Sequence, residues 1–281
     1  MSYAKGVDLL DIRPAVKNAL KEDIGAKDIT TESLIPKDNF VKAILLTKED
    51  CVVCGLGVAG LVFKLQDKSI KFKPLVREGS FAQKGKTLAI ISGKAKSILT
   101  AERVALNYLS LLCGISTNTR KFSDAVKPYK VKILDTRKTI PGLRLLEKYA
   151  VRIGGAFNHR LSLDEMILIK DNHLKIIAGI DKLTGFNRKY KVEIEVKNLK
   201  EFKEALRLCP DMIMLDNISV KNMKEAVKIR NKIHRHHPKL EASGGISLRN
   251  IHKVAGCGID MVSIGELTHS VKSVDISLEI L

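Results

Sequence analysis

The stretch VEIEVKNLKEFKEALRLCPDMIMLDNISVKNMKEAVKIRNKIHRHHPKLEASGG, residues 192–245, decides the fold. It alternates short apolar runs of strand length with amphipathic runs of helical length. Asn198 and Ser219 stand where the two helical runs begin, and both residue types cap helix N-termini well. Repeated strand–helix units of this kind predict a parallel sheet, either open or closed into a barrel.

The same rhythm extends on both sides of this stretch. A helical pattern over Pro141–Ile153 has proline at its opening position, where a missing backbone N–H costs nothing. The strand-length runs of the region are Val131–Leu134, Met166–Ile169, Val192–Val196, Met212–Leu215, Leu240–Ser243 and Met261–Ile264. We therefore expect a catalytic α/β barrel over residues 111–270, partly open and built from about six strands.

The first half of the chain follows another pattern. Predicted helices cover Leu9–Glu22 and Ala101–Cys113, the second of which links the two halves. Predicted strands cover Val41–Thr47, Cys51–Cys54 and Ile70–Val76; Gly55–Gly60 is glycine-rich, and Glu78–Gly85 contains turn signals. We expect an N-terminal α+β sandwich domain over residues 1–110, and a C-terminal segment, 271–281, that packs back on it.

The composition is that of a globular protein with many cations. The 281 residues are 45% hydrophobic and 28% charged, and the formal net charge is +18. That charge favours anionic partners: nucleic acid, a membrane surface or small anionic substrates. The lysines are dispersed and aromatic residues are only 5%, with no Trp, so stacking platforms for nucleic acid are scarce. We expect a cytoplasmic protein with no membrane or nucleic-acid partner, since neither a signal peptide nor a membrane-spanning apolar run is evident.

Two clusters resemble metal sites by spacing. Cys51 and Cys54 form a C-x-x-C motif, but no second Cys or His pair follows at ligand spacing, which favours structural cysteines. The basic cluster HRHH, residues 234–237, stands just before Pro238 at the end of a predicted helix. Cations suit that end of the helix dipole, so a solvated helix end is favoured over a metal site.

All six predicted strands of the barrel end in polar or glycine-rich sequence. Ligands of parallel α/β folds bind beyond the carboxyl ends of the strands. Arginine holds carboxylate or phosphate with a planar pair of donors, and lysine supplies a movable charge. The residues here that suit anions are Arg137, Lys138, His159, Arg160 and Lys170. Backbone N–H groups for phosphate come from Ser243, Gly244 and Gly245, which open a predicted helix, and from Gly265.

Two carboxylates stand among these cations. Glu195 and Asp216 would suit sugar hydroxyls, a divalent metal held together with phosphates, or the positive charge of a transition state. Single residues have structural alternatives: Arg137 could pair with Asp135 or Glu195, and Glu193 is expected to form a salt bridge or face solvent. The set as a whole predicts a site for an anionic acid, a phosphorylated sugar and a metal.

The motifs at these positions resemble those of the quinolinate phosphoribosyltransferase family. They cover nearly the whole chain in the family's order: Glu22–Gly25, Asp28–Thr31, Thr100–Arg103, Asp135–Thr139, Pro141–Arg152, Asn158–Arg160, Ile169–His173, Leu215–Asn217, Glu241–Ile246 and Leu267–Ser270. The resemblance implies an enzyme that joins quinolinate to phosphoribosyl pyrophosphate with magnesium. Its products would be nicotinate mononucleotide, pyrophosphate and carbon dioxide.

The resemblance also implies roles for the site residues. Arg137, His159, Arg160 and Lys170 would hold the two quinolinate carboxylates. Lys138 would face phosphoribosyl pyrophosphate, with Glu195 and Asp216 on the ribose hydroxyls or, through water, in the metal shell. The phosphate loops would be lined by Ser243, Gly244, Gly245 and Gly265. Arg103 matches an arginine that reaches the neighbouring subunit's site, so a homodimer or larger homo-oligomer is expected.

Three residues depart from the family pattern, and two rival functions remain open. Ile140 replaces a common Thr, Ala156 a common Gly, and Glu266 a common small residue, which puts the phosphate geometry in doubt. One rival is a related phosphoribosyltransferase that uses another acid, such as a nicotinate-specific enzyme or the molybdenum-transport-associated homologue. The other is a nucleic-acid-binding protein. The substrate binding order and the separate roles of Glu195 and Asp216 are not fixed by sequence.

Overall fold

The computed structural model describes residues 9–183, 189–233 and 237–281, so most of the histidine-rich cluster lies outside the described residues. The chain forms two compact units that interleave in sequence. Unit 1 comprises the chain up to Arg120 together with Thr139–Gly155 and Leu267–Leu281, and unit 2 comprises Lys121–Lys138 and Ala156–Glu266. Residues 139–155 and 267–270 thus belong to unit 1, although the sequence pattern groups them with the barrel.

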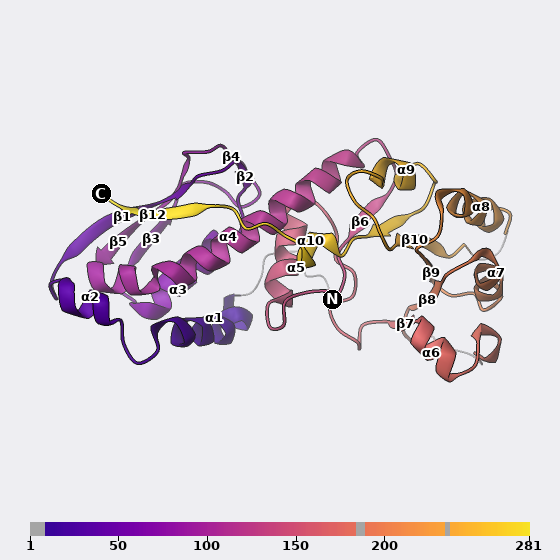
Figure 1. Ribbon diagram of the computed structural model, residues 1–281, viewed down its shortest axis with the longest axis horizontal. Helices are drawn as coiled ribbons and strands as arrows, with labels where there is room; N and C mark the ends of the chain where they lie inside the picture. Colours follow the sequence, from indigo (N-terminus) through magenta and orange to yellow (C-terminus); the bar gives the residue numbers. More distant parts are fainter. Residues whose placement is uncertain (1–8, 184–188, 234–236) are drawn as a thin grey trace. The chain divides into compact units, whose positions relative to one another are not determined.

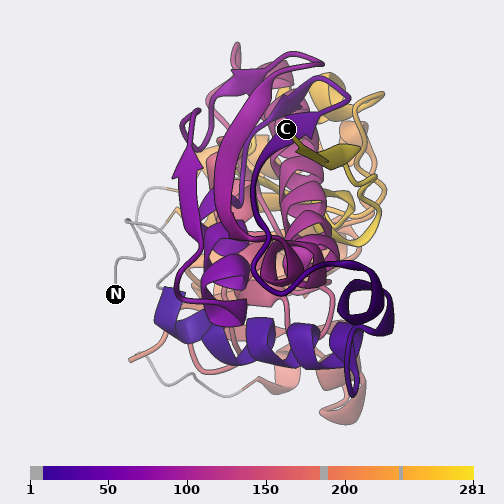
Figure 2. The same cartoon turned by 90° about the vertical axis from the view of Figure 1, so that its left-hand side faces the viewer.

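Unit 1 is built on a four-stranded antiparallel sheet with strand order β12-β1-β5-β3. β1 (Phe40–Thr47) pairs on one side with β5 (Thr87–Lys94), which continues to β3 (Lys71–Pro74). On its other side β1 pairs with the C-terminal strand β12 (Ile276–Ile280), with Leu45 opposite Leu278. A short second sheet joins β2 (Cys51–Val52) to β4 (Phe81–Ala82). Figure 2 looks onto this unit.

The helices of unit 1 include two that the sequence pattern did not predict. The helices are α1 (Leu9–Ile24), α2 (Ile29–Leu34), α3 (Leu56–Gln66), α4 (Ala95–Ala125, whose last residues fall in unit 2) and α5 (Arg144–Ile153). Of these, α2 and α3 were not predicted, and α3 begins inside the glycine-rich stretch Gly55–Gly60. The Glu78 carboxylate accepts the N–H groups of Gly55 and Leu56 at 2.9 and 2.7 Å, a cap supplied from far along the chain.

α5 also begins later than predicted. The helical pattern pointed to Pro141, but residues 141–143 form a turn with Gly142 at φ +81°, and the helix starts at Arg144. α4 is far longer than the predicted Ala101–Cys113. By length and composition alone it could cross a membrane, with a mean hydropathy of 1.3 over 18 residues, but 61% of that window is buried in the structure. Such burial is typical of a core helix.

Unit 2 is a six-stranded, all-parallel sheet covered by helices, which confirms the predicted α/β class and strand number (Figure 1). The strand order is β6-β11-β10-β9-β8-β7, with β6 (Lys132–Leu134) and β7 (Ile167–Ile169) at the edges. Between them lie β8 (Val192–Val196), β9 (Met212–Asp216), β10 (Lys239–Ser243) and β11 (Met261–Ser263). The six predicted strands correspond to these six within a few residues.

Two helices of unit 2, those after Asn198 and Ser219, begin where the capping residues predicted. The helices of unit 2 are α6 (Asp171–Ile176), the 3₁₀ turn Ile180–Lys182, α7 (Leu199–Arg207), α8 (Val220–Asn231) and α9 (Ile251–Ala255), followed by α10 (Glu266–His269) at the boundary with unit 1. The Asn198 side chain accepts the N–H of Glu201, and Ser219 accepts that of Asn222. α7 packs on β8 and β9. Because successive side chains of a strand point to opposite faces, β8 has apolar residues on one face and Glu193 and Glu195 on the other.

Candidate active site

The polar strand ends of unit 2 meet at one edge of the sheet. Parallel register sets Ser243 opposite Asp216, and Glu195 opposite Met214. Asp216 lies close enough to Glu195 to raise the pKa of that carboxyl, after the larger effect of partial burial. The predicted gathering of strand-end side chains is therefore present for β8, β9 and β10.

A buried aspartate anchors the loop that carries two predicted anion ligands. Asp135, fully buried after β6, accepts the backbone N–H of His159 at 2.8 Å and the side-chain amide of Asn158 at 2.5 Å. Backbone pairing between Asp135 and Phe157 ties the same loop to β6. This fixes Arg160 near Arg137, whose charge lowers the pKa of the Arg160 guanidinium after the larger effect of burial. Two guanidinium groups held together in this way form a binding site for anions.

Arg160 is only partly satisfied by the protein. Its Nη1 donates to the carbonyl of Met166 at 2.9 Å, while its buried Nε has no hydrogen-bond partner among the residues that the structure describes. A buried donor without an acceptor costs free energy, so a ligand that supplies an oxygen there is favoured. Arg137 is half-buried and Lys138 is exposed at the same loop.

His159 contacts protein groups through both of its ring nitrogens. Its Nδ1 accepts the backbone N–H of Arg160 at 2.8 Å, and its Nε2 lies 3.0 Å from a carboxylate oxygen of Glu193. Both ring nitrogens are therefore engaged within the protein, and the side chain is only 7% exposed. This geometry does not fit the direct carboxylate contact that the family resemblance implied for His159.

Glu193 and Glu241 form a buried acidic pair. The prediction for Glu193 was partly wrong, and no role was predicted for Glu241. Glu193 was expected to form a salt bridge or face solvent, but it is fully buried, so the solvent-facing alternative is wrong. Glu241 was not singled out, and it is also fully buried. Burial raises the pKa of each carboxyl to about 8. The sequence signal that could have identified this pair is a glutamate inside each of two short strands, VEIEV and KLEAS.

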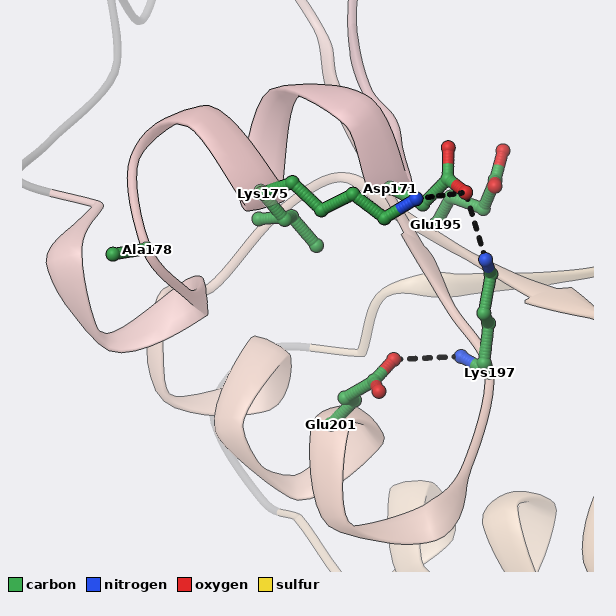
Figure 3. A pocket seen from close by; sticks show the side chains of 7 residues that line it. Asp171, Lys175, Ala178, Glu195, Lys197 and Glu201 are labelled. Carbon is green, nitrogen blue, oxygen red and sulfur yellow. Dashed lines mark hydrogen bonds and ion pairs between the residues drawn. The ribbon is translucent and has the colours of Figure 1, made fainter.

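An open pocket of about 300 Å³ adjoins Glu195 (Figure 3). Figure 3 shows the Asp171 and Glu195 carboxylates side by side, with Lys197 directed at Asp171. The Lys197 ammonium lies 2.8 Å from the Asp171 carboxylate, and the Lys170 ammonium lies 3.8 Å from that of Glu195. Asp171 and Lys197 were not predicted as site residues. Asp171 lies two positions after the predicted strand end Ile169, and Lys197 directly follows the predicted strand end Val196.

The glycine loop after β10 differs from the predicted phosphate cradle. Gly244 has φ +88°, and a Cβ there would collide with the Asn217 side chain, so only glycine fits. No helix opens at Gly245, contrary to the prediction: residues 247–250 form a turn and α9 starts only at Ile251. Asn250 closes the turn by donating to the carbonyl of Gly245 at 2.8 Å. A phosphate here would meet loop N–H groups rather than a helix dipole.

The remaining predicted residues, Gly265 and Arg103, belong to different units. Gly265 follows β11, after Ile264, which is paired to Leu134 of β6 by its backbone N–H. Arg103 is exposed on α4 in unit 1. Cationic side chains, buried carboxylates and glycine loops at the carboxyl end of a parallel α/β sheet define an enzyme that binds anionic substrates.

Comparison with known proteins names the family. Residues 28–113 match the model "Quinolinate phosphoribosyl transferase, N-terminal domain", and residues 115–279 match that of the C-terminal domain. The chain therefore belongs to the quinolinate phosphoribosyltransferase family, as its motifs predicted.

Individual relatives match nearly the whole chain. A probable carboxylating nicotinate-nucleotide pyrophosphorylase of Methanocaldococcus jannaschii is 42% identical over 94% of this chain and 95% of its own. The chloroplastic enzyme of that name from Arabidopsis thaliana is 39% identical, over 96% of this chain and 83% of its own. The solved nicotinate-nucleotide pyrophosphorylase of Francisella tularensis superposes with a TM-score of 0.92 at 36% identity, and each chain is covered completely.

Proposed function

We propose that this enzyme transfers the phosphoribosyl group of phosphoribosyl pyrophosphate to quinolinate with loss of carbon dioxide, a step of NAD biosynthesis. The observation that carries the proposal is the paired guanidinium site of Arg137 and Arg160, with its unmet buried donor. Lys170 lies near enough to Glu193 to lower its pKa, as Arg160 does, so all three cations surround one region. Three cations suit a ligand with two carboxylates.

The chemistry follows from the charges. The ring nitrogen forms a bond to ribose C1′ as the bond from C1′ to pyrophosphate breaks, and positive charge builds on the ribose. Glu195 and Asp216 stabilise that charge and accept hydrogen bonds from ribose hydroxyls. Lys138, exposed beside the guanidinium pair, neutralises the departing pyrophosphate. Ser243, Gly244, Gly245 and Gly265 offer backbone N–H groups to the 5′-phosphate.

Carbon dioxide leaves after the nitrogen has been ribosylated. The ring is then a pyridinium cation, which takes up the electron pair left at C2 when the adjacent carboxylate departs. A proton completes the C2–H bond. Arg137, Arg160 and Lys170 need only hold the other carboxylate and keep the ring in place while water is excluded.

The donor set fits magnesium carried by the pyrophosphate of the substrate. Magnesium prefers oxygen ligands, keeps several waters and is usually bound through substrate phosphates. Asp216 lies at the carboxyl end of β9, and Glu195 is half-buried. Both carboxylates would contact such hydrated magnesium through water. When bound, the ion would neutralise the leaving pyrophosphate.

Arg103 is assigned to the site of a neighbouring subunit in a homodimer. Its exposure on α4 is compatible with that role, and the motif Thr100–Arg103 supports it. Arg103→Ala and Lys138→Ala variants, each inactive alone, should regain partial activity when mixed, because a hybrid dimer holds one intact site. A mixture that stays inactive, although subunits demonstrably exchange, contradicts a shared site. We expect the enzyme in the cytoplasm, and the bacterial and archaeal relatives support this.

Substrate choice tests the function directly. The purified protein is incubated with phosphoribosyl pyrophosphate, magnesium and either quinolinate or nicotinate, and mononucleotide formation is followed. The proposal predicts turnover with quinolinate and little with nicotinate, which lacks the second carboxylate. The reverse preference would assign the chain to the related enzymes that use another acid.

A further inference from the structure

Inside the sheet of unit 2, one histidine lies between two buried glutamates. His159 Nε2 is 3.0 Å from Glu193 on β8 and 3.6 Å from Glu241 on β10. Both glutamates are fully buried. In the described part of the chain, Glu193 Oε1 and both carboxylate oxygens of Glu241 make no hydrogen bond that meets standard geometry. Neither glutamate has a role in the chemistry given above.

The partner of the other ring nitrogen decides the tautomer of His159. The backbone N–H of Arg160 donates to Nδ1 at 2.8 Å, so Nδ1 carries no proton. The proton of the neutral ring is then on Nε2, which donates to Glu193. A doubly protonated ring would place a second hydrogen against the Arg160 N–H. His159 is therefore held neutral in a single tautomer.

This tautomer argues against a metal ion at the cluster. The three ligand atoms lie within 4.8 Å of one another, which by spacing would suit a metal. A metal on Nε2, however, needs the proton on Nδ1, where it would donate to a second-shell acceptor. Here Nδ1 faces a donor.

Charged and polar groups face both glutamates. Glu193 is faced by His159, Arg160, Lys170 and Glu195. Glu241 is faced by Glu193, His159, Ser263 and Asp135. Burial is the largest influence on both carboxyls and raises the pKa of each, so both hold a proton more tightly than an exposed glutamate does.

We propose that Glu193 and Glu241 are positioning residues that act on the substrate-binding Arg160 through His159. The glutamates hold the ring by its Nε2–H, and the ring holds the backbone of Arg160 by its Nδ1. The guanidinium is thereby placed beside Arg137 before substrate arrives. The inference deepens the proposed function and rests on it for the kinetic readout. It also assigns His159 to the support of the site rather than to direct substrate contact.

Two replacements of His159 separate the support role from direct contact. In His159→Asn the amide oxygen can take the place of Nδ1 and accept from Arg160, but the side chain does not reach Glu193. In His159→Gln the amide nitrogen can take the place of Nε2, but the acceptor for Arg160 is lost. If His159 supports Arg160, the Gln variant raises KM for quinolinate by about tenfold and the Asn variant by about threefold or less, the effect of one hydrogen bond. Direct contact through Nε2 predicts the opposite order.

A matched pair of variants at Glu193 tests the contact between Glu193 and the His159 ring. Glu193→Gln keeps an acceptor for Nε2–H without a charge and should leave KM within about twofold, whereas Glu193→Leu should raise KM about tenfold with a smaller change in kcat. Equal KM values in the two folded variants overturn the proposal. If the Glu193→Leu variant fails to fold, the Glu193→Gln variant alone decides: a tenfold rise in KM there contradicts a neutral glutamate.

The closing experiment does not depend on turnover. ¹⁵N NMR of the His159 ring in the parent protein, at neutral pH and without substrate, should show an unprotonated Nδ1 and a protonated Nε2. A protonated Nδ1 overturns the inference whatever the enzyme turns over. Absent quinolinate turnover together with the expected tautomer would instead refute the proposed function and leave the relay geometry intact.

Discussion

The amino end of the sheet in unit 2 and the glutamates inside its strands differ in how their carboxylates are satisfied. At the amino end, Asp260 precedes β11 and accepts from Arg230 at 2.7 Å, Leu240 N–H at 2.9 Å and Lys239 at 3.2 Å. Burial acts to raise its pKa, but these partners together hold it below the ordinary value. Glu193 and Glu241, inside β8 and β10, and Glu195, near the carboxyl end of β8, all have a raised pKa, with burial as the first cause.

The difference shows which carboxylates stabilise the fold and which remain unsatisfied near the site. The amino end pairs its charges and closes the sheet, so changes there should affect stability. The strand interiors keep buried acids, and the loop of the site keeps a buried Arg160 donor, that the described protein groups do not fully satisfy. Such unsatisfied groups are tolerated at functional sites at a cost in stability.

The largest expected effect is on catalysis by Lys138→Ala. Removing a cation that faces the departing pyrophosphate should lower kcat by roughly 10²–10³-fold. The melting temperature should not change, because Lys138 is exposed. Steady-state kinetics and thermal unfolding measure the two effects. Lys132→Ala, on the same stretch but at the amino end of β6, is the matched control and should keep full activity. Full activity of the Lys138 variant removes its proposed role.

Arg160→Lys should have the next largest effect. Lysine keeps the charge but loses the planar pair of donors and the contact with Met166, so KM for quinolinate should rise by about 10- to 100-fold. Initial rates over a range of quinolinate concentrations give the value. Arg207→Lys, exposed in the last turn of α7, is the control. An unchanged KM at Arg160 would mean that this guanidinium does not hold a carboxylate.

Site residues at strand ends could be located from the sequence, because each of them follows its own strand directly in the chain. The strand-end positions of Arg137, Lys170 and Asp216 need only the strand pattern and the rule for parallel sheets. The inward turn of His159 does not follow from sequence, since it depends on Asp135 of one loop and on glutamates of two other strands. The start of α3 was missed for a similar reason: its cap comes from Glu78, 22 residues from Leu56.

At the amino end, Asp260→Asn should affect stability alone. It weakens a largely buried ion pair, which should lower the free energy of unfolding by about 1–3 kcal/mol. The expected fall in melting temperature is several degrees, seen by calorimetry. The pKa of Asp260 is depressed in the folded state, so its contribution is present above the unfolded pKa and is lost as pH falls through the folded one. The variant should therefore lose less stability in acid than the parent. A loss of kcat per folded molecule would contradict the division between the two ends.

The smallest expected effect is on the pH dependence of stability in alkali. The pKa of Glu193 and of Glu241 is raised from 4.5 to about 8, so the folded state binds more protons between these values. Their stabilising contribution is complete below the unfolded pKa and is lost as pH rises through about 8. The double variant Glu193→Gln/Glu241→Gln should show a flatter decline, with a slope difference of at most about 2.7 kcal/mol per pH unit, about 1.4 for each carboxyl. Urea unfolding at pH 6–9 measures it, and parallel curves would contradict neutral buried acids.

The most direct test of the whole account follows the carboxylate that leaves. Quinolinate labelled in the ring-2 carboxylate is incubated with the enzyme, phosphoribosyl pyrophosphate and magnesium, and labelled carbon dioxide, pyrophosphate and mononucleotide are counted together. A site built to hold two carboxylates and to release one predicts equal amounts of all three products. Pyrophosphate release without labelled carbon dioxide, or no turnover of quinolinate at all, would contradict it.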